Sequence, residues 1–179
     1  MVDWYWWDGC YATCDGSKYC FFYGLHSKRY GQNKIIRADD DIFYAPLNKE
    51  IFKSGDILVP CLSSDFLIAE ADEWRKEAWR IIKQRPDLIS RIVTKRIDRF
   101  YVSLPEDWED GYDNVEIYCG VENQETADYR LPLFLSHRVK YRMVFCILCA
   151  SPCRTRKKYS VNGTVYTKML PIQGFEAIA

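Results

Sequence analysis

The sequence lacks any apolar run of the roughly 20 residues that a helix needs to span a bilayer. Its N-terminus also lacks the basic and apolar regions of a secretory signal peptide. No internal repeat, low-complexity tract or obvious linker divides the chain. These absences predict a protein without membrane contact, located in the cytoplasm and built as a single α/β domain over residues 1–179.

An excess of charge is also missing, because 25 basic side chains balance 25 acidic ones and the isoelectric point is near 6.7. No global positive field therefore points to a nucleic-acid partner. The short basic stretch "RTRKK" at residues 154–158 favours such a partner locally, although stretches of this kind are more often solvated loops. A hydrophobic content of 48% is far above that of a disordered chain.

Short apolar runs alternate along the chain with amphipathic helical stretches. The apolar runs predict four strands, at Asp56–Leu62, Leu88–Arg96, Asn114–Val121 and Val139–Ala150. Strands that are separated by helices imply βαβ units, parallel pairing and a layered or barrel α/β fold.

Two helices are predicted between these strands. "DEWRKEAWRIIKQRP" should be capped by Asp72 and ended by Pro86. Its apolar stripe consists of Trp74, Ala78, Ile81 and Ile82. "NQETADYRL" should be capped by Asn123 and ended or kinked by Pro132.

Polar residues follow three of the predicted strands, at the edge where such folds place their chemistry. They are Ser63, Ser64 and Asp65, then Thr94, Lys95 and Arg96, then Glu122, Asn123 and Gln124. We expect Asp65, Lys95 and Glu122 to face the same cavity as the N-terminal cysteines, with Lys95 offsetting the two carboxylates. The alternative is that these residues are polar because loops generally are.

Three cysteines lie close together near the N-terminus, spaced as Cys10-x3-Cys14-x5-Cys20. Soft thiolates grouped on a short segment suit an iron–sulfur cluster. A zinc site would want a fourth ligand, for which His26 is the nearest candidate. The third interpretation is that these cysteines are buried and bind no metal.

The other cysteines are predicted to be mainly structural. Cys146, Cys149 and Cys153 lie in or beside the most apolar run, where burial is favoured over metal binding. Cys61 and Cys119 lie in predicted strands and should belong to the core.

Several sequence segments, in the same order, resemble the phage- and bacterium-borne three-Cys-motif family, whose members have no known function and look like radical S-adenosylmethionine (SAM) enzymes. These segments are "WYWWDGC", "KYCFFYG", "CLSSDFLIAEADEWRKEAWRIIKQRPDL", "IVTKRIDRF", "LPEDWEDGYDNVEI" and "ENQETADYRLP". The resemblance runs from about Trp4 to about Leu135. It implies a partial TIM-type barrel or open parallel sheet in which three N-terminal cysteines hold a [4Fe–4S] cluster that binds SAM and cleaves it to a radical.

The chain departs from the family in two places. The family spacing Cys-x6-Cys-x2-Cys maps onto Cys10, Ser17 and Cys20, and the common radical-SAM spacing also reaches Ser17. Cys14 is the substitute that the chain offers. Residues 136–179 form a divergent C-terminal segment, so the barrel is expected to be incomplete.

The leading hypothesis is therefore a radical-SAM-like iron–sulfur protein that acts on a nucleic acid or a phage-related substrate. Its expected metal ligands are Cys10, Cys14 and Cys20. The strand-end positions assign catalysis to Lys95 and Glu122, and cofactor binding to Ser64, Asp65 and Asn123. The alternative is a non-catalytic protein that has lost its cluster and binds a protein partner through the aromatic run Trp4–Trp7, if that run is exposed.

Overall fold

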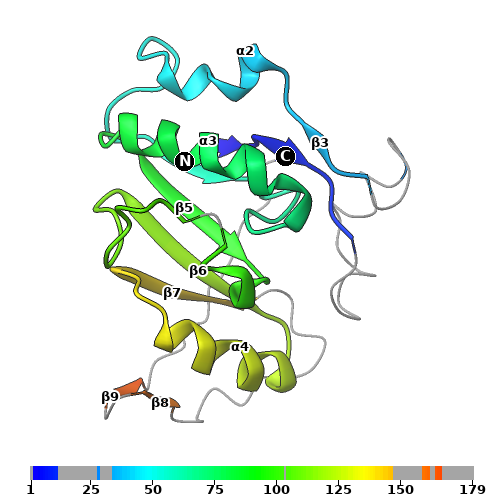
Figure 1. Ribbon diagram of the computed structural model, residues 1–179, viewed down its shortest axis with the longest axis vertical. Helices are drawn as coiled ribbons and strands as arrows, with labels where there is room; N and C mark the ends of the chain where they lie inside the picture. The colour runs from blue at the N-terminus through cyan, green and yellow to red at the C-terminus, as the bar shows by residue number, and fades with distance from the viewer. Residues whose placement is uncertain are drawn as a thin grey trace.

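A five-stranded parallel sheet forms the centre of the protein (Figure 1). The computed structural model describes residues 2–11, 28, 34–102, 104–146, 159–161 and 164–166. The strands of this sheet are β1 (Val2–Trp4), β4 (Ile57–Pro60), β5 (Ile89–Thr94), β6 (Val115–Val121) and β7 (Tyr141–Cys146). Each strand pairs in parallel with the next in that order.

Two antiparallel strand pairs and several helices complete the described elements. The pairs are β2 (Trp7–Asp8) with β3 (Ile36–Arg37), and β8 (Tyr159–Val161) with β9 (Thr164–Tyr166). The helices are α2 (Asp40–Phe43), α3 (Asp72–Gln84) and α4 (Gln124–Ser136). Short 3-10 turns lie at η2 (Ala45–Leu47), η3 (Ala69–Ala71) and η4 (Ile97–Arg99).

The order of the parallel strands follows the chain without a reversal. In a doubly wound sheet the order reverses at a switch point, and ligands bind there. The described sheet has no such reversal. Connections between parallel strands are almost always right-handed, and with this strand order right-handed connections all run along the same face of the sheet. Because all five strands are parallel, their carboxyl ends lie at one edge of the sheet, termed the carboxyl edge below.

One face of the sheet belongs to the main apolar core. Along β6, Val115, Ile117, Cys119 and Val121 are buried, whereas Glu116 and Tyr118 between them are only half-buried. The same core cluster includes side chains of α3 and α4. Both long helices therefore contribute to the core on this face.

Polar side chains occupy part of the opposite face of the sheet. Arg91 on β5 forms an ion pair with Glu116 on β6 at 2.7 Å. The hydroxyl of Tyr118 donates to the same carboxylate at 3.0 Å. The alternation of apolar and polar residues along β6 thus follows the two faces of the sheet.

Helix α3 forms as predicted but does not use the predicted cap. The helix begins at Asp72 itself, and Ala71 stands at the cap position without a side-chain hydrogen bond. The Asp72 carboxylate instead forms ion pairs with Arg75 at 2.6 Å and Arg99 at 2.8 Å. The prediction of Asp72 as a cap was wrong because two guanidinium groups compete for its oxygens.

Helix α4 begins as predicted and does not end at Pro132, which was predicted to end or kink it. The side chain of Asn123 accepts a hydrogen bond from the Thr126 N–H at 2.8 Å, within a reciprocal capping box. The helix continues through Pro132 to Ser136. An internal proline costs about 3 kcal/mol, and burial of Leu131 and Phe134 on either side offsets that cost.

The aromatic run Trp4–Trp7 lies mainly in the core. Trp6 and Trp7 have exposures of 0%, whereas Tyr5 is 47% exposed. The indole of Trp6 donates to the Phe43 carbonyl at 2.9 Å, and the indole of Trp7 donates to the Asp65 carbonyl at 3.2 Å. This run is therefore a packing element rather than a surface anchor.

Candidate functional site

Asp65 is the anchor of the site at the carboxyl edge. It lies in the loop after β4 and is only 3% exposed. Its Oδ1 accepts hydrogen bonds from the Leu67 N–H at 2.9 Å and the Thr94 hydroxyl at 2.7 Å. Its Oδ2 accepts the Lys95 N–H at 2.8 Å. These three donors hold the carboxylate in one orientation and satisfy the need of a buried anion for partners.

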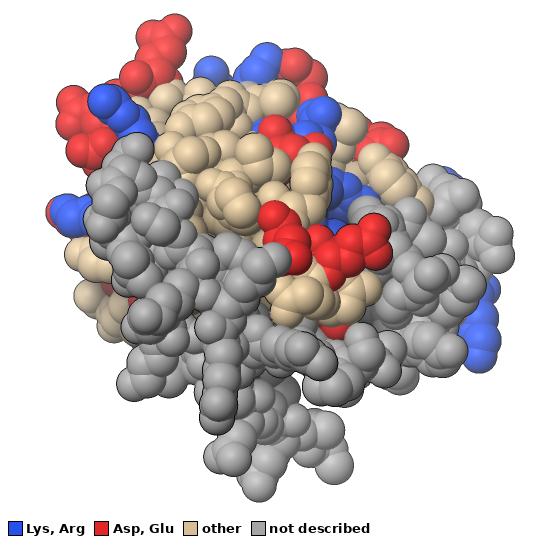
Figure 2. Space-filling view, turned by 90° about the horizontal axis from the view of Figure 1, so that it is seen from below, with Lys and Arg blue, Asp and Glu red and all other residues tan. Residues whose placement is uncertain are grey.

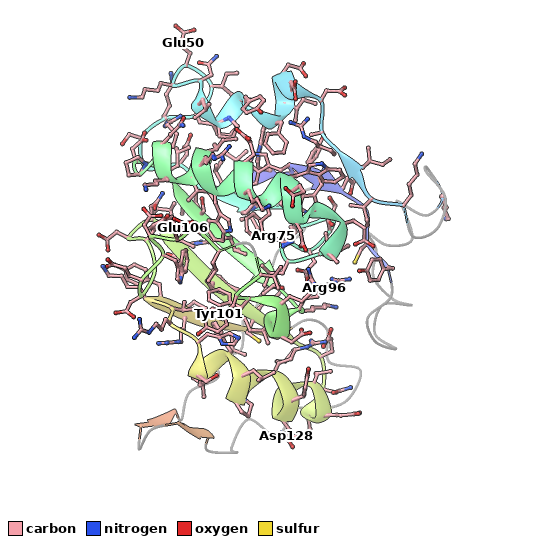
Figure 3. All side chains as sticks on the ribbon, in the orientation of Figure 1. Glu50, Arg75, Arg96, Tyr101, Glu106 and Asp128 are labelled. Carbon is pink, nitrogen blue, oxygen red and sulfur yellow. The ribbon has the colours of Figure 1, made fainter. Side chains whose placement is uncertain are left out.

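Arg96 connects this carboxylate to the N-terminal cysteine segment. Its Nη1 lies 3.1 Å from Asp65 Oδ2, and its Nη2 donates to Cys10 Sγ at 3.8 Å. The guanidinium also lies over the Tyr11 ring, 4.9 Å from the centroid. Burial lowers the pKa of Arg96, but the Asp65 carboxylate and Cys10 raise it overall. Figure 3 shows Arg96 at the edge toward which the arrow of β5 points.

The segment that carries Cys10 is fastened to the loop after β4. The Ser64 hydroxyl donates to the Gly9 carbonyl, and Gly9 adopts a φ of 99° that favours glycine. The Cys10 thiol donates to the Tyr11 carbonyl at 3.3 Å. The Tyr11 hydroxyl donates to Glu70 Oε2 at 3.2 Å. Cys10 as a residue is partly exposed.

A second charged group lies where β6 ends. Glu122 is 5% exposed and forms ion pairs with Lys95 Nζ at 2.8 Å and Arg130 Nη1 at 2.6 Å. Arg130 also donates to the Gly120 carbonyl at 2.7 Å. Lys95 therefore contacts both carboxylates, Asp65 through its backbone N–H and Glu122 through its ammonium.

The structure thus brings several predicted residues to one edge of the sheet. They are Cys10, Ser64, Asp65, Lys95 and Glu122, joined directly or through Arg96 and Gly9. Asn123 is adjacent in the chain, and its side chain is used to cap α4.

Other predicted residues lie outside the described part of the chain. These are Cys14, Ser17, Cys20, His26, Cys149, Cys153 and the basic stretch 154–158. Cys146 ends β7, and its side chain is likewise not described. Among the described residues, no three His, Cys, Asp or Glu side chains gather as a metal-binding group.

The prediction that Cys61 and Cys119 belong to the core is confirmed. Their exposures are 1% and 0%. Burial raises the pKa of each thiol to about 12. Cys61 lies directly after β4, in a left-handed turn with a φ of 58°, rather than within the strand.

Sequence reasoning missed two members of the site. Tyr11 supplies the aromatic surface under Arg96, and no spacing rule identifies it. Arg130 lies on the buried side of α4 with Ala127, Leu131 and Phe134. A charged residue within an otherwise apolar helix face was the signal that could have indicated Arg130.

The surface seen from below mixes charges of both signs. In Figure 2, Lys, Arg, Asp and Glu side chains surround an area of uncharged residues, and acidic side chains lie close to basic ones. Within the described chain, none of the helices is both long and apolar enough to cross a membrane.

The fold and the site define an α/β protein with a parallel sheet and a buried charge network at its carboxyl edge. Residues 2–147 match the family described as "Protein of unknown function (DUF5131)", and the chain belongs to that family. No curated protein and no solved structure matches the chain.

Proposed function

We propose that this chain is an iron–sulfur protein of the radical-SAM type. In this proposal Cys10, Cys14 and Cys20 hold a [4Fe–4S] cluster at the carboxyl edge of a partial (β/α) barrel. The observation that carries the proposal is the position of Cys10, a partly exposed residue whose sulfur lies beside Arg96 at the edge where such folds place their chemistry.

The surroundings of Cys10 fit a metal ligand better than those of the buried cysteines. A thiol binds iron as the thiolate, and the guanidinium of Arg96, 3.8 Å from the sulfur of Cys10, would complement the negative charge of such a ligand. Burial acts in the opposite direction at Cys61 and Cys119, where it raises the pKa to about 12. Ser64 further supports the site by holding the Gly9 carbonyl and thus the backbone before Cys10.

The strand order supports the barrel part of the proposal. Consecutive strands of a (β/α) barrel are neighbours in space, as they are in the described sheet. A barrel also keeps its helices on the outer face, and the core shared by α3, α4 and one face of the sheet agrees with that arrangement.

When bound, the cluster and SAM would supply the electron transfer and radical chemistry. The chain's own residues would prepare the site. Lys95 would present a positive charge to substrate, and Glu122 would orient that ammonium through their 2.8 Å ion pair. Asp65 would act through Arg96, and Asn123 would support the edge by capping α4. The family resemblance suggests a nucleic acid or a phage-related molecule as substrate.

Anaerobic reconstitution with ferrous iron and sulfide tests the proposal. The parent chain is expected to take up about four iron atoms per chain and to gain the broad visible absorbance of a cluster. Cys10→Ala should lose this absorbance. Cys119→Ala is the matched control, because its thiol is buried in the apolar core, and it should bind iron as the parent does.

Two results would contradict the proposal. A parent chain that binds no iron under reducing, oxygen-free conditions would favour the non-catalytic alternative. Equal iron content in the Cys10→Ala and Cys119→Ala variants would show that iron binds away from the carboxyl edge.

A further inference from the structure

A continuous series of aromatic rings crosses the core from the carboxyl edge to the opposite edge of the sheet. Its members are, in order, Trp7, Phe66, Trp79, Trp108 and Tyr112, and neighbouring ring centroids lie 5.1 to 5.4 Å apart. The first indole donates to the carbonyl of Asp65 at the carboxyl edge. In Figure 3, Glu106, from the loop that carries Tyr112, and Arg96, from the carboxyl edge, lie at opposite ends of the sheet.

The end of this aromatic series differs from its interior in the acceptor that is available for a proton. Loss of one electron makes an indole N–H or a phenol O–H strongly acidic, so a base beside that group stabilises the oxidised ring. The Trp79 indole N–H is buried without a hydrogen-bond partner, and the Trp108 indole N–H donates to the Arg138 carbonyl at 2.9 Å. The Tyr112 hydroxyl donates to Asp107 Oδ1 at 2.7 Å. Within the series, Tyr112 is therefore the member that is bonded to a carboxylate, at a distance suited to proton transfer.

We propose that the aromatic series carries an oxidising equivalent away from the carboxyl edge and releases it at Tyr112. A radical oxidant takes one electron from the half-buried Trp74, whose ring lies 6.5 Å from that of Trp7. Electrons then move along the series toward Trp7, across Phe66, until Tyr112 has supplied the last one and has passed its phenolic proton to Asp107. This function is independent of any group bound at Cys10.

The cycle closes at the surface, where the bond between Tyr112 and Asp107 is exposed. A soluble thiol donates a hydrogen atom to the phenoxyl oxygen of Tyr112, and Asp107 releases its extra proton to water. The balance is one oxidant reduced by one electron, one thiol oxidised to a thiyl radical and one proton released. The buried tryptophans end the cycle unchanged.

The resting charges of the final pair suit this direction of transfer. Burial and the hydrogen bond to Asp107 raise the pKa of Tyr112, so the phenol keeps its proton at rest. The hydrogen bonds from Lys83 and Tyr112 lower the pKa of Asp107, so its carboxylate is ionised and accepts. An oxidised tyrosine that gives its proton to a base is lower in free energy than an oxidised tryptophan that keeps its proton. The oxidised state therefore collects at Tyr112.

Tyr101 provides a matched control at a second branch of the same rings. It is linked to Trp108 through Phe100, with centroid distances of 5.5 Å and 5.8 Å. Its hydroxyl oxygen accepts the Arg138 N–H at 3.3 Å, whereas that of Tyr112 has a carboxylate partner. Ring contact alone would send oxidation to both tyrosines, but a proton acceptor directs it to Tyr112.

Pulse radiolysis of the full chain with azide radicals, which oxidise tryptophan in preference to tyrosine, tests the proposal. Optical detection follows the loss of the indolyl radical and the gain of the phenoxyl radical. The parent should show first-order conversion with a rate constant independent of protein concentration. Tyr112→Phe should lose the phenoxyl signal of this phase, Tyr101→Phe should keep it, and Asp107→Asn should slow its formation. A soluble thiol should shorten the lifetime of the phenoxyl signal in the parent.

The contrary results are equally defined. Equal phenoxyl yields in Tyr112→Phe and Tyr101→Phe overturn the proposal, as does a rate that rises with protein concentration, which assigns transfer between molecules. A phenoxyl lifetime that does not respond to the thiol overturns the release at the surface. Thermal unfolding midpoints check that each variant is folded. If Tyr112→Phe does not fold, Asp107→Asn at the exposed carboxylate decides, and an unchanged rate in that variant overturns the proposal.

Discussion

Thr94 and Asp65 are joined by a hydrogen bond of 2.7 Å, which the Thr94 hydroxyl donates to the carboxylate. The same hydroxyl oxygen accepts the Arg96 N–H at 2.9 Å. Thr94 therefore ties the end of β5 to the loop after β4 and also shapes the turn that presents Arg96. Two strand ends are held as one unit by a single side chain.

Neutralising Asp65 should destabilise the fold. Asp65→Asn leaves Arg96 buried without its carboxylate and offers an amide N–H₂ where the native site needs acceptors. Breaking a buried pair in this way costs about 3 kcal/mol of unfolding free energy. Urea denaturation measures the loss. Glu73→Gln, which breaks the exposed pair with Lys76, should change the free energy by less than about 1 kcal/mol. Equal effects of the two substitutions would contradict the anchoring role of Asp65.

His137 should make stability depend on pH. The ring is 7% exposed, donates from Nε2 to the Ile97 carbonyl at 2.9 Å and stacks on Phe100. Burial and the charge of Arg142 lower its pKa below 6.5, despite the opposing effect of the Ile97 hydrogen bond. The unfolded chain therefore takes up a proton first as the pH falls, and the stability present above pH 6.5 is lost below it.

The measurement is the free energy of unfolding of the parent and of His137→Gln at pH 8 and pH 5. Glutamine keeps an N–H donor but does not titrate. The loss of stability between the two pH values should be smaller in the variant. Equal losses would mean that other groups cause the pH dependence.

The capping box of α4 should account for the main contribution of Asn123. Asn123→Ala removes the acceptor for the Thr126 N–H and should lower the unfolding free energy by about 1 kcal/mol. Asn123→Ser keeps a capping oxygen and should retain most of the stability. If serine is as destabilising as alanine in thermal or urea unfolding, the carboxamide must serve a purpose other than the cap.

Cys14 should be the third thiolate of the proposed cluster. Cys14→Ala is expected to abolish the broad visible absorbance after reconstitution, because both family spacings otherwise place a ligand at Ser17. Ser17→Cys should then change the iron content little. The reverse pattern, a gain of iron with Ser17→Cys and no loss with Cys14→Ala, would place the ligand at position 17.

The grouping of residues at the carboxyl edge could be predicted from the sequence, because it requires only the approximate positions of the parallel strands. Parallel strands end at the same edge whatever their exact bounds, so Asp65, Lys95 and Glu122 could be grouped from three apolar runs and the residues after them. The four predicted strands correspond to β4, β5, β6 and β7, with ends that differ by a few residues; residues 147–150 lie outside the described chain.

What sequence reasoning missed depends on contacts between distant segments. β1 has only three residues, too few for a periodic pattern, and it becomes a strand by pairing with β4. Pro132 predicts a helix end or a kink locally, but α4 extends past it, with buried side chains on both sides. Arg96 and Cys10 are 86 residues apart, and the sequence around either residue does not predict their contact.

The pairing of β1 with β4 has a consequence for biosynthesis. Cys10 precedes its contact Arg96 by 86 residues. At ribosomal rates of about 5 to 20 residues per second, Cys10 emerges roughly 4 to 17 seconds before Arg96. In the first part of that interval, before β4 has emerged, the nascent N-terminal segment lacks the strand that later pairs with β1. The Cys10 thiol thus remains without its Arg96 contact until that later part of the chain has been made.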